Sequence, residues 1–426
     1  MSPRSVITAV FFVDGALFGT WASRIPALSD HVHASAGILG VCLLAPAAAA
    51  VVSMPLVGRL LPGRSSSLFC RVAVAGLMAA IMLPALAQTV PELSASLLLV
   101  GVTNSTLDLV MNAQGVSIER GMRQPILSSL HAAFSFGGFA GAGLGALAAA
   151  LAVVPLAHFA FAAALFGALG LYATLRLPRD DHDVDAEAPK LRWTRLPTRL
   201  MLIGVACFFS LMAEGGASDW SAKLVRDDLA GTAALGAIAY AVFSVGMGAG
   251  RLLADRLWSR WGAGGLLRRS GVLAAVGFAV GLGIGTVPSA IAGFVALGLG
   301  LAGVIPTLFR AGADHPGVST GPALAAVSSV GYLGFLAGPP IIGAIAQITS
   351  LRLACAVLVL AGIVVLLLAP VAGAESEPRE LPAQRPRDRQ RLRESARAFD
   401  AHDHRSLSPH EHVAGEPNAV ASDLSV

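Results

Sequence analysis

The feature that most constrains the fold is a series of apolar runs, each about as long as a membrane is thick. Runs such as 68–88, 265–287 and 350–372 contain few charged residues. Helices of roughly 20 residues cross a hydrocarbon core of ~30 Å at 1.5 Å per residue. Charged residues make up only 13% of the chain, whereas soluble domains carry about 25%. The sequence therefore predicts an all-α, polytopic membrane protein.

Twelve membrane-spanning helices are expected, in two groups of six. Between the sixth and seventh lies the charged segment 178–197, which we interpret as a cytoplasmic linker joining N-terminal (1–177) and C-terminal (198–372) six-helix bundles. Residues 373–426 are rich in Pro, Arg, Glu, Asp, His and Ser, which is typical of a disordered tail. The expected spans are 6–28, 37–61, 68–88, 91–116, 126–152, 154–177, 198–222, 233–257, 265–287, 289–310, 320–348 and 351–372.

The placement of arginine and lysine predicts the orientation of these helices. If both termini are cytoplasmic, the outer side holds only Arg24, Lys223, Arg226 and Arg352, and the inner loops hold most of the remainder. Cytoplasmic loops of membrane proteins are enriched in these residues. We therefore expect a multi-pass protein of the cytoplasmic (inner) membrane. The net charge of +4 then reflects topology, and no nucleic-acid partner is expected.

The two halves of the sequence repeat short motifs in the same order. "GRLLPGR" (58–64) and "GRLLADR" (250–256) share their first four residues and their last. "FFVDGALFGTW" echoes "FFSLMAEGGASDW", although the acid stands at a different distance from the tryptophan, so we expect the two acids to face differently. "GGFAG" and "LGFLAG" repeat more loosely. The pattern predicts a duplicated six-helix unit with parallel repeats.

Several of these segments carry a family resemblance. The span 6–372 resembles a major facilitator superfamily transporter, and "GRLLADR" resembles that family's loop motif between helices 2 and 3. The resemblance implies two pseudo-symmetric six-helix bundles that expose a central site to either side in turn. Five further segments are similar to the YbjJ-like branch, which is related to the fucose permease group of sugar–proton symporters: "GTWASRIPAL", "MNAQGVSIER", "SSLHAAFSFGGFAGAGLG", "AEGGASDWSAKLVRD" and "GYLGFLAGPPIIG".

An acidic residue interrupts the first apolar run. Asp14 shares a helical face with Phe18 and Trp21, and the resemblance implies that this helix lines the central cavity. A charge in that setting costs several kcal/mol unless it is paired, hydrated or neutralised. We expect Asp14 to bind and release a coupled proton, and Trp21 to offer an aromatic face to a sugar ring. The alternative is that Asp14 pairs permanently with an arginine or caps broken backbone.

The helix expected at 91–116 carries a polar stripe. Asn104, Asp108 and Asn112 recur every fourth residue on an otherwise apolar helix. Acids on the first and fourth helices match the fucose permease group, so Asp108 is a second proton-coupling candidate and the two amides are candidate solute ligands. The alternative role is hydrogen bonding between helices, which is worth about 0.6–2 kcal/mol per bond.

The C-terminal half offers its own candidates. Glu214 is the deeper acid of the helix at 198–222 and a third proton-coupling candidate, while Asp219 is expected to pair with Lys223. Trp220, with Tyr240 and Tyr332 on later helices, completes the predicted substrate-binding set, although each tyrosine is equally compatible with packing.

Charged residues of the two loop motifs are predicted to form a cytoplasmic gate. Such residues would bridge the halves when the inner side is closed and separate as the halves rock. Gly63 stands where the second copy has Asp255, so the first-half gate is expected to be weaker or built differently. The alternative role is that of ordinary basic flanks. The gating candidates are Arg59, Arg64, Arg251, Asp255 and Arg256.

No motif points to a cofactor, a metal site or catalysis. The four cysteines stand singly in apolar runs, which favours core packing over disulfides or zinc. Protease, phosphate-loop and hydrolase motifs are not found, so no enzyme is expected. The expected partners are a small solute, protons and the bilayer, and the chain is expected to be a monomer.

These observations predict a secondary transporter that moves a small polar solute, such as a sugar or related metabolite, coupled to protons. Two alternatives remain at this stage. A proton-driven drug or metabolite efflux antiporter would have the same fold but a more apolar cavity. A transport-inactive receptor or scaffold would use the tail to recruit a partner.

Overall fold

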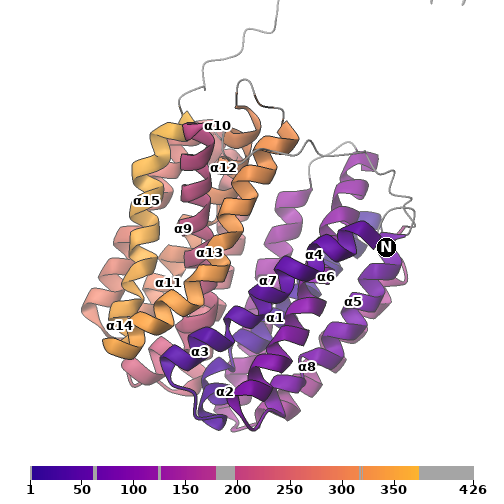
Figure 1. Ribbon diagram of the computed structural model, residues 1–426, viewed down its shortest axis with the longest axis vertical. Coiled ribbons are helices and arrows are strands. Elements are labelled where there is room, and N and C mark those ends of the chain that lie inside the picture. Colours follow the sequence, from indigo (N-terminus) through magenta and orange to yellow (C-terminus); the bar gives the residue numbers. More distant parts are fainter. Residues whose placement is uncertain are drawn as a thin grey trace, which may run out of the picture. The chain divides into compact units, whose positions relative to one another are not determined.

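The computed structural model describes residues 2–60, 65–122, 126–178, 197–315, 318 and 320–373. The predicted linker (178–197) and tail (373–426) lie almost wholly outside these residues. The described chain is mainly helical (Figure 1). Its elements are α1 (Pro3–Ala22), α2 (Ile25–His31), α3 (Ala36–Cys42), α4 (Leu44–Leu60), α5 (Ser66–Ala80), η1 (Leu83–Ala85), α6 (Val90–Met122), α7 (Leu127–Ala150), α8 (Pro155–Thr174), α9 (Thr198–Lys223), η3 (Leu224–Asp228), α10 (Ala233–Ile284), α11 (Val287–Leu301), α12 (Val304–Ala313), α13 (Thr320–Ile348), α14 (Leu351–Ala354) and α15 (Ala356–Gly373).

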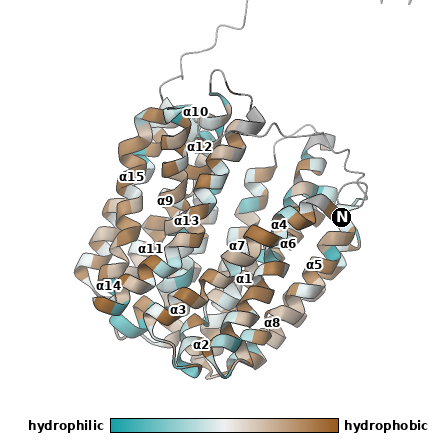
Figure 2. Cartoon of the chain, in the orientation of Figure 1, coloured by the Kyte–Doolittle hydropathy of each residue, from teal (hydrophilic) through white to brown (hydrophobic). Residues whose placement is uncertain are grey.

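Within the described residues, eleven helical stretches are long and apolar enough to cross a membrane. Figure 2 shows hydrophobic residues along most of them and hydrophilic residues gathered mainly toward their ends. This pattern matches a protein whose solvent is lipid along the helices and water at both edges. The predicted all-α membrane fold is confirmed.

The eleven stretches correspond to twelve spans because α10 contains two. Its 52 residues would measure about 78 Å as one straight helix, more than twice the ~30 Å hydrocarbon core. Gly262 interrupts it with φ 65° and ψ 174°, a conformation that L side chains rarely adopt. Gly246 on the first arm and Gly277 on the second both contact α11, at Val295 and Ala296 respectively. The chain therefore reverses at Gly262.

Some predicted spans are interrupted where continuous helices were expected. The predicted span 6–28 contains α1 and the start of α2, with Ser23 and Arg24 between them. Pro26 explains this break, because proline lacks the N–H donor that would continue α1 but is well accommodated in the first turn of a new helix. The predicted span 289–310 is similarly divided between α11 and α12 at Ala302 and Gly303.

Both halves repeat one close helix contact. In the first half α7 lies against α1, where a Cβ added to Gly137 would come within 2.0 Å of the Phe12 carbonyl oxygen. In the second half α13 lies against α9, where a Cβ on Gly334 would come within 2.0 Å of the Phe208 carbonyl oxygen. Only glycine allows backbones to approach this closely. This repeated contact supports the predicted duplication.

Candidate substrate and proton site

Asp14 lies in the most enclosed part of α1. Its side chain is 1% exposed, and its Oδ1 atom has no hydrogen-bond partner among the described residues. Gly15 and Gly19 follow it in α1, and each packs against an α7 backbone carbonyl, of Phe134 and Gly138 respectively. No arginine among the described residues forms an ion pair with Asp14, which counts against the alternative that Asp14 pairs permanently with an arginine.

A second carboxylate lies within electrostatic range of Asp14. It belongs to Asp108 of α6, whose Oδ1 accepts a 2.9 Å hydrogen bond from Asn112 Nδ2. The same Nδ2 donates to the Asp108 backbone carbonyl at 2.8 Å, so these bonds of Asn112 remain within α6. Asn104, Asp108 and Asn112 are all partly exposed. These bonds do not join two helices, which weakens the alternative that the stripe only holds helices together.

Glu214 and Arg251 form the charged part of the site in the second half. Arg251 Nη2 lies 3.1 Å from Glu214 Oε1, and both side chains are mostly buried. Arg251 Nη1 also donates to Ser135 Oγ at 2.8 Å and to the His131 carbonyl at 3.3 Å. Since Ser135 and His131 belong to α7, this guanidinium joins α9 and α10 to a helix of the first half.

This placement corrects the prediction for Arg251. The loop motif predicted that Arg251 lies at a helix end and acts in a gate at the cytoplasmic edge. The first arm of α10 instead continues past it to Gly262, so Arg251 lies inside the bundle. It does bridge the halves, but through Ser135, which the sequence analysis did not single out.

Two tyrosines surround these charges. Tyr240 is 3% exposed; a Cβ added to Gly138 of α7 would be 3.4 Å from its hydroxyl, and its ring centroid lies 6.1 Å from that of Phe18. Tyr332 of α13 is 52% exposed and lies within electrostatic range of both Asp108 and Glu214. Tyr332 therefore lies in the region between the polar stripe of α6 and the ion pair of the second half.

The two tryptophans do not present an open ring in this conformation. Trp21 is 5% exposed and Trp220 is 0% exposed. Trp220 Nε1 is buried without a hydrogen-bond partner among the described residues. The predicted stacking of Trp21 on a solute, and the predicted contact of Trp220 with it, therefore require a rearrangement of the surrounding helices.

The predicted pairing of Asp219 with Lys223 is wrong. Lys223 Nζ instead lies 2.7 Å from Asp227 Oδ2, also one helical turn away, where η3 continues α9. Asp219 lies beside Ser218, whose Oγ is 3.4 Å from its Oδ1, and within electrostatic range of Tyr240. Asp219 thus belongs to the polar surroundings of the central site.

The remaining gating candidates do not form the predicted link in the part of the chain that the structure describes. Asp255 pairs with Arg310 at 2.7 Å, and both belong to the second half and are exposed. Arg256 is exposed on α10. The side chain of Arg59 and the whole of Arg64 lie outside the described residues. Among the described residues, the ion-pair partner of Asp255 is therefore Arg310 of its own half.

A cross-half ion pair that the sequence analysis missed lies at the opposite edge. Arg226 Nη1 and Nη2 lie 2.6 and 2.9 Å from the two oxygens of Asp30. Nearby, Gln347 Oε1 accepts a 3.1 Å hydrogen bond from the Gly37 backbone, and Gly40 packs against Gly343. We call these contacts the edge clamp. The sequence could have predicted the ion pair, because Asp30 and Arg226 are oppositely charged and each follows the first helix of its half.

Among the described residues, no group of three or more His, Cys, Asp or Glu could hold a metal ion. The arrangement instead brings two acids, an ion pair and several hydroxyl and amide groups into one membrane-buried region. Such groups can bind protons and hydrogen-bond a polar solute.

Comparison with known proteins supports a transporter. The chain is 33% identical over 371 residues to an uncharacterized transporter, y4wD, of Sinorhizobium fredii, covering 87% of this chain and 98% of that protein. It is 31% identical to an uncharacterized MFS-type transporter of Yersinia pestis, covering 85% and 92%. It is 30% identical to the membrane protein MosC of Rhizobium meliloti, covering 85% and 89%. These names specify neither a substrate nor a coupling ion, and they do not decide the YbjJ-like branch.

The fold is also similar to solved transporters. The nucleoside transporter NupG, in its D323A mutant, matches with a TM-score of 0.68 at 14% identity, covering 88% of this chain and 99% of that one. The human organic anion transporter MFSD10 matches with a TM-score of 0.59 at 16% identity, covering 87% and 98%. Residues 6–320 match the family described as Major Facilitator Superfamily. Together with the duplicated helices and the buried polar site, this match shows that the chain belongs to the Major Facilitator Superfamily.

Proposed function

We propose that the protein is a proton-coupled secondary transporter that moves a small polar solute across the cytoplasmic membrane by alternating access. The observation that carries this proposal is that both halves place acids inside an apolar bundle, Asp14 and Asp108 in the first half and Glu214 in the second. Asp14 and Asp108 interact electrostatically in the first half, and Tyr332 lies within range of both Asp108 and Glu214. Charged groups are costly at such depth and mark ion and substrate pathways.

The coupled proton is assigned to the pair of Asp14 and Asp108. Two negative charges held close together in a low-dielectric region are expensive, and a proton on one of them relieves that cost. The free Oδ1 of Asp14 offers a position for it. Glu214 is a weaker candidate because Arg251 already neutralises it.

Solute binding is assigned to the groups that face this region without being fully enclosed. Asn104, Asn112 and Tyr332 carry the amide and hydroxyl groups that hydrogen-bond a solute rich in hydroxyls. A solute that competes for Arg251 would weaken its bond to Ser135. Binding would then act directly on a contact between the halves, as alternating access requires.

The edge clamp supports the same mechanism. By the distribution of arginine and lysine, its edge is the outer one, with both termini cytoplasmic. The described conformation is thus proposed to be closed to the outside, and outward opening would separate Asp30 from Arg226. The transporter is proposed to work as a monomer.

A thermal-shift screen followed by flux measurement tests the proposal. Sugars, sugar acids, nucleosides, organic anions and cationic drugs are screened for stabilisation of the purified chain. Hits are assayed in proteoliposomes for uptake driven by an imposed pH gradient. We expect at least one hydrophilic solute to stabilise the protein and to be taken up by the proteoliposomes. Uptake that ignores the pH gradient would refute proton coupling, and a folded protein without flux or counterflow for any solute would favour a receptor.

A further inference from the structure

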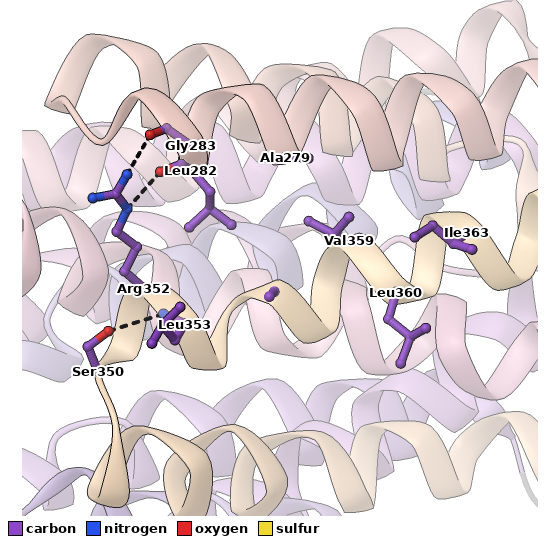
Figure 3. A pocket seen from close by; sticks show the side chains of 10 residues that line it. Ala279, Leu282, Gly283, Ser350, Arg352, Leu353, Val359, Leu360 and Ile363 are labelled. Carbon is purple, nitrogen blue, oxygen red and sulfur yellow. Dashed lines mark hydrogen bonds between the residues drawn. The ribbon is translucent and has the colours of Figure 1, made fainter.

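A groove lies on the side of the second half, away from the residues of the central site. It has a volume of about 610 Å³ and runs between the second arm of α10 and the α14–α15 segment (Figure 3). Its lining is apolar except for Ser350 and Arg352 at one end. Leu353 and Leu360 on its border are exposed. In a membrane-spanning helix pair, these residues face lipid.

The groove is about as long as one leaflet is deep. Its lining on this side extends from Arg352 to Ile363, a rise of about 16 Å along a helix. The hydrocarbon of one leaflet is half of ~30 Å. Small residues, Ala279, Gly283 and Ala356, contribute to the lining and make room between the helices. These dimensions fit a single acyl chain that extends from the edge of the membrane toward its middle.

Arg352 is held rigidly at the membrane edge. Its Nε donates to the Leu282 carbonyl at 2.7 Å and its Nη2 to the Gly283 carbonyl at 2.6 Å. The guanidinium lies against Gly285, where φ is 72° and a Cβ would be 2.4 Å from Nη2. The third nitrogen, Nη1, makes no hydrogen bond to the described residues, and Figure 3 shows one nitrogen without a bond that points away from α10.

One acid lies close to this arginine. Asp228 Oδ2 accepts a 2.7 Å hydrogen bond from the Arg352 backbone N–H. The ion pairs within the described residues include none between Asp228 and the guanidinium. The charge of Arg352 is therefore available to an anionic group at the mouth of the groove.

We propose that this groove binds a phospholipid, with one acyl chain along α15 and the phosphate accepting a hydrogen bond from Arg352 Nη1. Charge complementarity selects a phosphate, because arginine binds phosphate oxygens strongly through fixed N–H donors. The proposed orientation places the lipid in the outer leaflet. The inference is independent of the transported solute.

Native mass spectrometry of the full chain tests this proposal. The protein is purified in a mild detergent and mixed with dioleoylphosphatidylglycerol or with dioleoylglycerol, which has the same chains but no phosphate. We expect one tightly retained phospholipid per chain and at least threefold less retention of dioleoylglycerol. Arg352→Gln and Ala356→Phe, which fills the groove, should each lower phospholipid retention at least threefold. Val276→Phe, at an exposed position on the second arm of α10 outside the groove, is the matched control.

Three results would overturn the proposal. Equal phospholipid retention in Ala356→Phe and Val276→Phe would show that the groove is not the site. Equal retention of the two lipids by the unsubstituted chain would remove the role of the phosphate. A dimer that Ala356→Phe abolishes would assign the groove to a second copy of the chain. If Arg352→Gln does not fold, Ala356→Phe and the comparison of the two lipids on the unsubstituted chain still test the proposal, since both experiments keep Arg352.

Discussion

The first helices of the two halves pack alike but carry different electrostatics. In α1, Asp14 is buried with a free oxygen and another acid nearby, whereas in α9, Glu214 is paired with Arg251. The repeated glycine contacts give the register between them, because the same offset relates Phe12 to Phe208 and Ala16 to Met212. In that register Glu214 corresponds to Phe18, one turn beyond Asp14.

This register corrects the expectation that the two acids face differently. Residues four apart share a helical face, so both acids lie on corresponding faces, displaced by one turn. The comparison teaches that backbone packing and polar chemistry are specified by separate residues. Glycines fix how the helices meet, and the acids can then differ between halves without changing that packing.

The largest expected effect comes from Asp14→Asn. The substitution removes the titratable group but keeps its shape, so pH-gradient-driven uptake should fall by about 100-fold or more, equivalent to about 2.7 kcal/mol. Counterflow at equal pH should persist and lose its pH dependence. The protein should be as stable as before, because a neutral amide is less costly to bury than a charge. Proteoliposome flux and thermal melting measure these outcomes.

Asp255→Asn is the control, since Asp255 is an exposed acid that pairs with Arg310 outside the central site. If Asp14→Asn retained gradient-driven uptake, Asp14 would not be the proton-coupling residue. The proposed functional difference between Asp14 and the paired Glu214 would then be wrong.

The repeated glycine contacts should be equally intolerant of a methyl group. Gly137→Ala and Gly334→Ala each place a Cβ against a carbonyl oxygen, and such overpacking costs about 1–3 kcal/mol. Gly143→Ala on α7 should be neutral, because nothing lies within 4 Å of its added Cβ. Melting temperatures in detergent test this. A marked difference between Gly137→Ala and Gly334→Ala would show that the two helix contacts are not equivalent.

Loss of the ion pair of the second half should cost an amount within the same range. Arg251→Gln leaves Glu214 without its partner and weakens the link to Ser135, so we expect a loss of about 2 kcal/mol, between values for exposed and buried pairs. Glu214→Gln in the same chain should recover part of it. A double-mutant cycle on stability and flux measures the coupling, and additive effects would show that the pair does not act as a unit.

The edge clamp should have the smallest effect on stability. Asp30→Asn removes an exposed ion pair worth at most about 1 kcal/mol. The same change should shift the conformational balance toward opening at that edge, raising the labelling rate of a cysteine introduced at Gly37. Asp255→Asn, which breaks a pair within one half, is the matched control and should leave that rate unchanged.

Much of the fold was predictable because lipid demands long apolar helices, and a sequence shows these directly. The twelve spans and the duplication followed from that constraint and from the repeated motifs. The break after Trp21 was less visible, although Pro26 signalled it. Membership of the superfamily was predicted from local motifs and is confirmed.

The site was predictable only in its residue types. Asp14, Asp108 and Glu214 are visible in sequence because acids are rare in apolar runs, and their roles stay predictions. The partner of Arg251 was not predictable, since its bonds to Glu214 and Ser135 depend on how three helices meet. The motif position alone suggested a helix end, whereas the reversal occurs further on at Gly262.

The reversal at Gly262 has a mechanical consequence. Since the two arms of α10 follow one another without an intervening loop, neither can slide far along its axis without pulling its neighbour. A tilt that frees Arg251 from the other half must therefore swing the lipid-facing arm as well. In the proposed alternating-access cycle, each turnover would tilt this arm against the surrounding lipid. The stiffness of the bilayer would then provide part of the resistance to that tilt.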